Sequence, residues 1–330
     1  MIAKEDVIQA HKRIMPIINR TPLITSGRLN ELLGHEIIFK AESLQITGAF
    51  KIRGVLNTVL SLIEQDKLPK KLVAYSSGNH ARAVAWAGIN IAHIPTEIYM
   101  HKSASASKRG AVKALGAKLI LTDTRKEAEV LARSAGEEPG AYFLHPSDND
   151  LVIAGAATLT YEALLDLKYS PDAIFAACGG GALSSGAYLG AKAAGMKSKI
   201  FAGEPAIAND ASRSYKLGKI VGFEESPLTI ADGLRTLRVS ERTFKYLQKL
   251  DGFYEAAEED ILYWSVWLNQ LLEIPCEPTA AITMVAAVNW LKTQKTKQRI
   301  LILLSGGNMD SDVLDIYKTS KYLESIPFLK

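Results

Sequence analysis

The sequence predicts an α/β protein built from mostly parallel sheets with helices on both faces. Short apolar runs alternate with longer segments of helical periodicity along almost the whole chain of 330 residues. The short runs are continuously apolar, which is typical of parallel strands buried on both faces. Several of them end directly before small polar residues and glycines, where open α/β sheets place their ligands.

Seven runs are predicted to be strands because they are short, apolar and rich in β-branched or aromatic residues. They are residues 37–39, 72–75, 96–100, 118–121, 173–177, 199–202 and 300–304. Eight longer segments have apolar residues at helical spacing. These predicted helices lie near residues 50–64, 80–92, 105–115, 125–135, 150–167, 182–195, 258–273 and 280–293.

The order of these elements predicts two domains. Four strands near residues 72–145 are expected to form a compact βα unit inserted between segments that build a larger sheet. We therefore expect residues 1–65 and 149–330 to form a large domain and residues 72–148 a small one. No internal repeat, low-complexity tract or flexible linker interrupts the pattern.

Composition and charge disfavour several classes of function. The chain has 39 basic and 35 acidic residues, a net charge of +4, and no long basic block. We therefore expect no nucleic-acid or membrane partner. No run approaches the roughly 18 apolar residues that span a bilayer, and the N-terminus lacks a signal-peptide pattern. The two cysteines, Cys178 and Cys276, lie far apart in apolar surroundings, which favours reduced thiols in a cytoplasmic protein.

The run from Ser43 to Gly54 is the most informative part of the sequence. Lys51 follows Phe50 and a Gly-Ala pair, and an amphipathic helical pattern begins directly behind it. A lysine at such a turn can point into a cleft, where loss of water lowers its pKa enough for Schiff-base chemistry. The alternative is a solvated lysine in the first turn of a helix.

Three further runs of small residues follow predicted strands, and the first two could bind an anion. They are Ser76 to His80, Cys178 to Leu183, and Ser305 to Asn308. Consecutive glycines and helix N-termini direct N–H groups toward phosphate or carboxylate. The glycine run does not fit a Walker A loop or the Gly-x-Gly-x-x-Gly fingerprint of nicotinamide-dependent dehydrogenases. Each run could also be a plain turn or a helix cap.

Glu204 and Asp210 are a candidate metal pair. They lie six residues apart with backbone carbonyls between them. Hard divalent cations such as Mg²⁺ or Ca²⁺ take oxygen ligands of this kind. Acids near a helix start are also common as caps, so both interpretations stay open.

Together these motifs resemble those of the fold-type II pyridoxal-phosphate enzymes, the family of threonine and serine dehydratases and serine racemases. The motifs occur in the family's order, and the resemblance runs from about Ile8 to Asp310. It implies a tryptophan synthase β-like fold with two open, mostly parallel sheets. It also implies that the active site lies in the cleft between the two domains.

The resemblance gives each motif a role. Lys51 would hold pyridoxal 5′-phosphate as a Schiff base, and Ser77 would act on the opposite face of the substrate Cα. The implied cofactor-binding residues are Phe50, Lys51, Asn79, Gly179, Gly180, Gly181, Ala182, Leu183, Gly233, Glu277 and Ser305. Ser76, Ser77, Asn79 and His80 would bind the substrate. Glu204, the Ala208 carbonyl and Asp210 match the Mg²⁺ or Ca²⁺ site of the serine racemase-like branch.

Several positions bear on which reaction is expected. Ser305 would face the pyridine nitrogen, and a hydroxyl there favours β-elimination or racemisation over transamination. Ala182 replaces the last glycine of the family's phosphate loop, and its methyl group would crowd a position of positive φ. Two other departures from the family pattern are Arg82, where a glutamine is common, and Ala156.

The resemblance therefore implies a pyridoxal-phosphate-dependent ammonia-lyase that converts L-threonine or L-serine to a 2-oxo acid and ammonia. Alternatives with the same cofactor are a serine racemase and a hydroxyaspartate dehydratase. A different class is a non-catalytic protein that binds the cofactor or a metabolite on the same scaffold. The expected partners are a small amino-acid substrate and a second copy of the chain in a homodimer.

Overall fold

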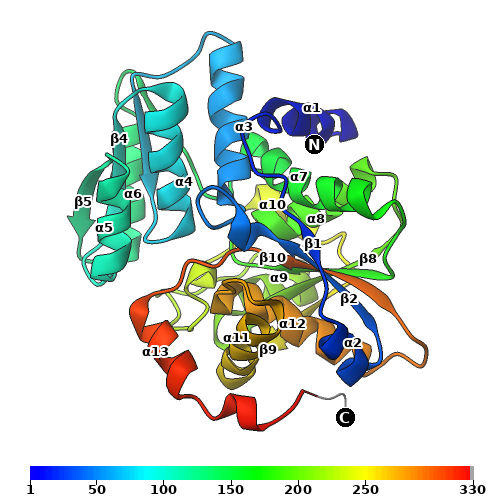
Figure 1. The fold of residues 1–330 in the computed structure, drawn as a ribbon. Coiled ribbons are helices and arrows are strands. Elements are labelled where there is room, and N and C mark those ends of the chain that lie inside the picture. The colour runs from blue at the N-terminus through cyan, green and yellow to red at the C-terminus, as the bar shows by residue number, and fades with distance from the viewer. Residues whose placement is uncertain (328–330) are drawn as a thin grey trace.

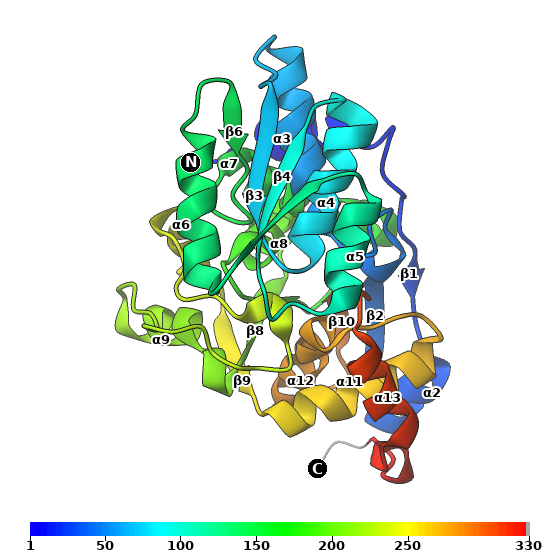
Figure 2. The same cartoon turned by 90° about the vertical axis from the view of Figure 1, so that its left-hand side faces the viewer.

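The computed structural model describes residues 1–327 and contains two separate sheets, each covered by helices (Figures 1 and 2). The larger sheet has six strands in the order β1-β2-β10-β7-β8-β9, and the smaller has four in the order β5-β4-β3-β6. Neighbouring strands are parallel throughout, except that β1 and β2 are antiparallel. The predicted fold class is confirmed.

The larger sheet takes its strands from both ends of the chain. They are β1 (Leu23–Ile24), β2 (Glu36–Ala41), β7 (Ala173–Ala177), β8 (Lys199–Pro205), β9 (Gly252–Ala256) and β10 (Arg299–Leu304). The smaller sheet comes from one continuous segment. Its strands are β3 (Lys71–Tyr75), β4 (Thr96–His101), β5 (Lys118–Thr122) and β6 (Ala141–Phe143). All seven strands predicted by range are present, and β6 is the fourth strand expected in the small unit, whereas β1 and β9 are additional.

Eight of the helices match predicted ones to within a few residues. They are α3 (Lys51–Glu64), α4 (Asn79–Ala87), α5 (Ala106–Ala114), α6 (Arg125–Gly136), α7 (Asp150–Leu167), α8 (Ala182–Ala193), α11 (Glu258–Leu272) and α12 (Pro278–Leu291). The others are α1 (Lys4–Ile14), α2 (Gly27–Leu33), α9 (Asp210–Leu217), α10 (Glu241–Leu247) and α13 (Ser311–Thr319). No helix within residues 1–327 has the length and apolar character needed to cross a membrane.

Helix α3 packs between α7 and the small unit. Its residues Ile52, Val55 and Leu56 are fully buried in the same apolar cluster as Leu72 of β3 and Ile98 of β4. Although we expected α3 to belong to the large domain, it therefore shares a core with the smaller sheet. The domain boundaries at residues 65–72 and 148–149 stay a prediction.

Helix α3 also crosses α7 at close range. A Cβ atom added at Gly155 would lie 2.5 Å from the carbonyl oxygen of Arg53, and one at Gly54 would lie 2.8 Å from that of Val152. Only glycine allows two backbones to approach this closely. The crossing fixes the start of α3, where Lys51 lies, against the larger half of the molecule.

Candidate active site

Lys51 is the first residue of α3, and its amine is poorly stabilised as a cation. Its Nζ donates a 3.0 Å hydrogen bond to the Pro146 carbonyl oxygen and lies 5.1 Å from the centre of the Phe50 ring. Burial lowers the pKa of Lys51 to about 8, and within residues 1–327 no carboxylate opposes this shift. A substantial fraction of the amine is therefore neutral near pH 8, as a nucleophile or base requires.

Ser305 is a buried hydroxyl that lacks a partner. It follows β10, is 2% exposed, and its Oγ makes no hydrogen bond to any group in the described residues. The Phe50 N–H donates to the Ser305 carbonyl at 2.9 Å, and Ala49 pairs with Gly306 in an isolated bridge. These contacts place the hydroxyl beside the start of α3. A buried unpaired hydroxyl is costly unless a bound group satisfies it.

The glycine run joins β7 to α8 and forms a cradle. Gly181 has a φ of +85°, which glycine adopts without strain. A Cβ atom at Gly180 would lie 2.3 Å from the Ser147 hydroxyl oxygen. Ala182 is the first residue of α8 and does not have a positive φ, so the expected crowding by its methyl group was wrong. The position of positive φ falls one residue earlier, on a glycine.

The short helix η4 (Asp232–Leu234) packs against this cradle. A Cβ atom at Gly179 would lie 3.2 Å from the Gly233 carbonyl oxygen. The Gly233 N–H donates to the Thr279 hydroxyl at 3.1 Å. Gly233 is thus placed beside the glycine run. Leu183, the second residue of α8, is buried behind the run.

Asn79 connects three loops. Its Nδ2 donates to Glu277 at 2.8 Å, and its Oδ1 accepts from Asn308 at 2.7 Å. Glu277 precedes α12, and burial together with the nearby Asp232 raises the pKa of its carboxyl to about 8. The Glu277 carboxyl is therefore largely protonated near pH 7. A glycine at 306 leaves room for it, because a Cβ atom there would lie 2.8 Å from Glu277 Oε1.

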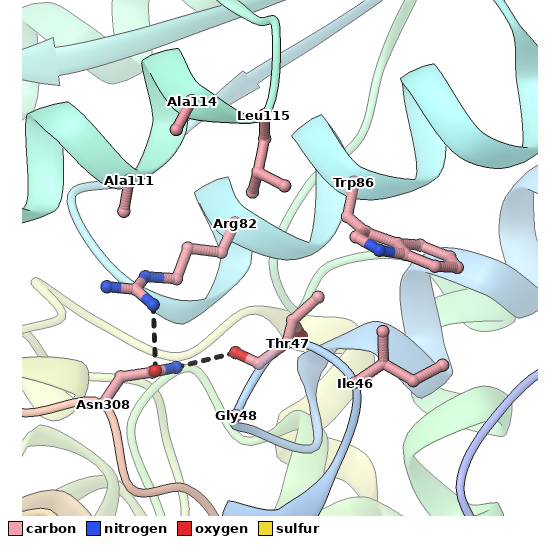
Figure 3. Close-up of a pocket in the computed structure, with 9 residues that line it drawn as sticks. All are labelled: Ile46, Thr47, Gly48, Arg82, Trp86, Ala111, Ala114, Leu115 and Asn308. Atoms are coloured by element: carbon pink, nitrogen blue, oxygen red, sulfur yellow. Dashed lines mark hydrogen bonds between the residues drawn. The ribbon is translucent and has the colours of Figure 1, made fainter.

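Arg82 also takes part in this connection (Figure 3). Its guanidinium donates to Asn308 Oδ1 at 3.0 Å, and Asn308 in turn donates to the Thr47 carbonyl oxygen at 2.8 Å. Arg82 thus ties α4 to the loop after β10. The two side chains line one side of a cavity of about 380 Å³. Its lining residues are Ile46, Thr47, Gly48, Arg82, Trp86, Ala111, Ala114, Leu115 and Asn308.

The loop from Ser76 to His80 leaves the end of β3. Ser76 Oγ accepts the Gly78 N–H at 3.1 Å, and Ser77 Oγ accepts from Arg125 at 3.2 Å. His80 is buried with Nε2 2.8 Å from the Leu144 carbonyl oxygen, and burial, helped by Lys51, lowers its pKa to about 3. The ring is therefore neutral and carries its proton on Nε2, which donates to this carbonyl, so Nδ1 has no proton to donate. The only group of His80 that could donate to an anion is then its backbone N–H. Carboxylate binding by this loop stays a prediction.

Glu204 and Asp210 lie close together, and both are buried. Glu204 lies near the end of β8 and accepts the backbone N–H groups of Ala211 and Ser212 at 3.1 and 2.8 Å, so it caps α9. Asp210 Oδ2 has no partner within residues 1–327. Burial, with repulsion from Asp210, raises the pKa of Glu204, and burial raises that of Asp210 to about 7. A cation between them would reverse both shifts.

The metal interpretation is neither confirmed nor contradicted by these contacts. In the described part of the chain, no group of three or more His, Cys, Asp or Glu side chains is arranged to hold an ion. The predicted ligand set contains only two carboxylates and the backbone carbonyl of Ala208. Ala208 is the last residue of the short helix η3 (Ala206–Ala208). The cap made by Glu204 is the other interpretation that the sequence left open.

Comparison with known proteins identifies the family. A family model described as "Pyridoxal-phosphate dependent enzyme" matches residues 14–306. The chain belongs to this family. It is 36% identical to the L-threo-3-hydroxyaspartate ammonia-lyase of Saccharomyces cerevisiae over 92% of this chain and 93% of that protein. It is also 36% identical to a serine racemase of Dictyostelium discoideum, over 94% of this chain and 95% of that protein.

Solved structures agree with this assignment. A threonine deaminase from T.th. superposes with a TM-score of 0.87 at 38% identity, covering 94% of this chain and 99% of that chain. Maize serine racemase superposes with a TM-score of 0.88 at 33% identity, covering 98% and 99%. The relatives of this pyridoxal-phosphate enzyme thus include both ammonia-lyases and racemases.

The residues present fit pyridoxal phosphate. The amine of Lys51 suits a covalent bond to its aldehyde, the unpaired Ser305 hydroxyl suits its ring nitrogen, and the glycine cradle suits its phosphate. Sequence patterns did not single out Arg125 or Ser147, which the fold brings to this site, and they matched His145 and Pro146 to the family without giving either a role. His145 had a signal, since it lies near the expected end of the small domain at residue 148 and precedes a proline.

Proposed function

We propose that this enzyme is an ammonia-lyase that converts L-threonine or L-serine to a 2-oxo acid and ammonia. The observation that carries the proposal is the pairing of a Lys51 amine of lowered pKa with a Ser305 hydroxyl that lacks a partner in the described residues. A neutral hydroxyl does not enforce protonation of the cofactor ring, which favours elimination or racemisation over transamination. The similarity to a threonine deaminase supports the choice of substrate.

Different residues of this chain have different roles in the proposed reaction. When bound, pyridoxal phosphate supplies an electron sink that acidifies the Cα–H bond of the amino acid. The Lys51 amine, with a pKa of about 8, is the base that accepts this proton. N–H groups at the start of α4 orient the substrate carboxylate. The start of α8 and the glycine run hold the phosphate.

The direct test is incubation of the holoenzyme with a panel of D- and L-amino acids. We expect 2-oxo acid to be released from L-threonine or L-serine, measured by a coupled dehydrogenase assay. The panel should include D-serine and both enantiomers of 3-hydroxyaspartate. A protein that holds the cofactor but releases no 2-oxo acid and racemises no substrate would be the non-catalytic binder instead.

Racemisation is a second candidate function, because Arg125 donates to the Ser77 hydroxyl at 3.2 Å. A cation beside a hydroxyl stabilises the alkoxide, so Ser77 suits a base on the second face of Cα. Relatives named as serine racemases support this candidate. The two functions share Lys51 and differ in their need for Ser77.

Hydroxyaspartate is a second candidate substrate, since Arg125 donates to Ser77 and lies near enough to Arg235 for their positive charges to repel. Burial and the nearby Arg235 lower the pKa of Arg125. Arg235 donates to the Thr229 carbonyl oxygen, and neither guanidinium forms an ion pair with a carboxylate in residues 1–327. The nearby acid, Asp232, is bound to Lys108. A substrate with a second carboxylate would neutralise this pair, as the similarity to a hydroxyaspartate ammonia-lyase also suggests.

Replacing Ser77 with alanine should separate the two reactions. Racemisation and elimination from D-substrates should fall by about 100-fold or more, the scale of general acid–base catalysis. Elimination from L-substrates through Lys51 should survive better. The measurement is the rate of each reaction by chiral chromatography and 2-oxo acid release.

The matched control for this variant is Ser76→Ala, which removes the neighbouring hydroxyl. Ser76 accepts the Gly78 N–H and has no part in proton transfer, so this change should affect all activities together. An equal loss of all activities in Ser77→Ala would assign Ser77 to the loop structure or to carboxylate binding.

The proposal includes a metal site formed by Glu204, the Ala208 carbonyl and Asp210. If Mg²⁺ or Ca²⁺ binds there, a chelator should lower the melting temperature and either ion should restore it, because a ligand of the native state stabilises by mass action. Asp210→Ala should abolish this response while the visible absorbance of the bound cofactor is retained. A melting temperature that does not respond to chelator would leave Glu204 as a helix cap only.

The proposal extends to assembly and location, with a homodimer in the cytoplasm. The thiols of Cys178 and Cys276 are free and buried, as is usual in a reducing compartment. Light scattering of the purified holoenzyme tests the assembly. A mass of one chain, 35.9 kDa, would contradict the dimer.

A further inference from the structure

The turn at residues 145–148 touches two parts of the active site. It connects β6 of the smaller sheet to α7. The Pro146 carbonyl oxygen accepts the hydrogen bond from Lys51 Nζ at 3.0 Å. Ser147 is 6% exposed and its hydroxyl fills the space beside Gly180, where a Cβ atom would come within 2.3 Å. The conformation of this turn therefore sets the position of the carbonyl that binds the lysine amine and of the hydroxyl that packs against the glycine cradle.

A single imidazole holds the turn. His145 Nδ1 accepts the backbone N–H groups of Ser147 at 3.1 Å and Asp148 at 2.6 Å. Within residues 1–327, these two N–H groups have no other acceptor. Without the imidazole, both N–H groups would lose their protein acceptor. The turn would then relax away from its present path.

The surroundings of His145 fix the tautomer that this role requires. Burial, with the positive charges of Arg133 and Lys51, lowers the pKa of His145 to about 3, so the ring is neutral near pH 7. Nε2 lies 3.4 Å from the Tyr75 hydroxyl and 4.0 Å from Glu129. Because Nδ1 accepts two backbone N–H groups, the proton of the neutral ring lies on Nε2. Edge-on contacts with the rings of Tyr75 and Phe143 fix the ring plane.

We propose that His145 is a positioning residue for Lys51. By accepting two N–H groups through Nδ1, its imidazole holds the turn on which the Pro146 carbonyl orients the lysine amine and Ser147 supports the glycine cradle. The inference rests on the role of Lys51 in the proposed function. It adds that the amine depends on a residue that touches neither substrate nor cofactor.

This arrangement predicts which kinetic constant changes. The substrate carboxylate is assigned to the loop after β3, and residues 76–80 make no hydrogen bond to residues 146–148 in the described part of the chain. Losing the turn should therefore leave KM nearly unchanged and lower kcat, because the free amine of Lys51 would sample poor angles for proton transfer. Misplacement of a reacting group by about 1 Å costs about 100-fold in rate.

Two substitutions form a matched pair. An asparagine places a carbonyl oxygen close to the position of Nδ1, whereas a glutamine places its amide near Nε2. His145→Gln should lower kcat by about 100-fold with little change in KM, and His145→Asn should stay within about 10-fold of wild type. Amide hydrogen exchange at Ser147 and Asp148 should be fast in the Gln variant and slow in the Asn variant.

Two further measurements make the test independent of turnover and of the folding of one variant. Uptake of pyridoxal phosphate by protein stripped of cofactor, followed by visible absorbance, should be slower in His145→Gln than in His145→Asn. Tyr75→Phe removes the partner of Nε2 and leaves Nδ1 in place, so it should keep both kcat and the slow amide exchange. Melting temperatures should show that every variant compared is folded.

Three results would overturn the inference. One is fast exchange at Ser147 and Asp148 with unchanged kcat and cofactor uptake. The second is an equal loss in His145→Asn and His145→Gln. The third is a loss in Tyr75→Phe as large as that in His145→Gln. If wild type takes up cofactor at Lys51 but acts on no amino acid, the proposed function fails, while cofactor uptake and amide exchange in the variants still decide the role of His145.

Discussion

Replacing Lys51 with alanine is expected to remove both the covalent attachment of pyridoxal phosphate and turnover. The rate of 2-oxo acid release should fall by about 1,000-fold or more, because the same amine holds the cofactor and accepts the Cα proton. The other buried amine next to α3, that of Lys40, is not suited to replace it. The fully buried Lys40 is held in an ion pair with Glu162 at 2.6 Å. Visible absorbance and 2-oxo acid release measure the two effects.

The control for this variant is cofactor-free wild-type protein. If Lys51→Ala is folded, its melting temperature should match that of the cofactor-free protein rather than that of the holoenzyme. Borohydride reduction followed by peptide mapping identifies any remaining covalent link. A reduced cofactor bonded to a different lysine, with activity retained, would contradict the assignment of Lys51.

The strands of both sheets could be predicted because buried parallel strands are apolar along their whole length. Residues 173–177 illustrate this, since β7 lies in the middle of the larger sheet and every residue of it is buried. The strand β9 escaped prediction because four of its five residues are only half-buried at the sheet edge. Short helices such as α10, with seven residues, give too few turns for a clear period.

The helix α1 had a signal that was available in the sequence. Its buried residues Val7, Ala10, His11 and Ile14 follow the i, i+3, i+4, i+7 spacing of an amphipathic helix. The Asp6 carboxylate also accepts the Ala3 N–H at 2.7 Å. An acidic residue three positions after the N-cap, which bonds back to the N-cap N–H, is a known signal for the start of a helix. Local patterns of this kind are readable without knowledge of the fold.

The candidate site could be predicted only where its residues lie in local motifs. Three parts of the site lie directly beside a predicted strand or helix, namely Lys51, the glycine run and Ser305. Their neighbours in the sequence were therefore enough to indicate that they belong to a site. Contacts such as that between Arg125 and Ser77, which are 48 residues apart, arise from the way the strands are ordered. No spacing rule predicts them before the sheet topology is known.

The same limit applies to a buried network of charges behind Lys51. Arg53 is fully buried and makes paired hydrogen bonds to Glu42 at 2.7 and 2.8 Å. It also binds Glu162 at 2.9 Å, and Glu162 binds Lys40. The four charges come from β2, the short helix η1 (Glu42–Leu44), α3 and α7, and they balance one another.

Replacing Arg53 with methionine is expected to destabilise the protein by about 3–5 kcal/mol, because removal of one partner leaves an uncompensated charge in the interior. The free energy of unfolding from urea titration of the holoenzyme measures the effect. A second change, Glu42→Gln, should recover part of the loss in the Arg53→Met background. That pair of substitutions leaves Lys40 and Glu162 as a balanced ion pair.

The matched control is Arg20→Ala, at the exposed edge of the same network. Arg20 pairs with Asp166, but its side chain is 59% exposed, so this change should cost no more than about 1 kcal/mol. If Arg53→Met costs no more than Arg20→Ala, the buried network does not hold α3 in place. If Arg53→Met is destabilised and Glu42→Gln makes it worse, the loss comes from the packing of the arginine side chain rather than from the unpaired carboxylate.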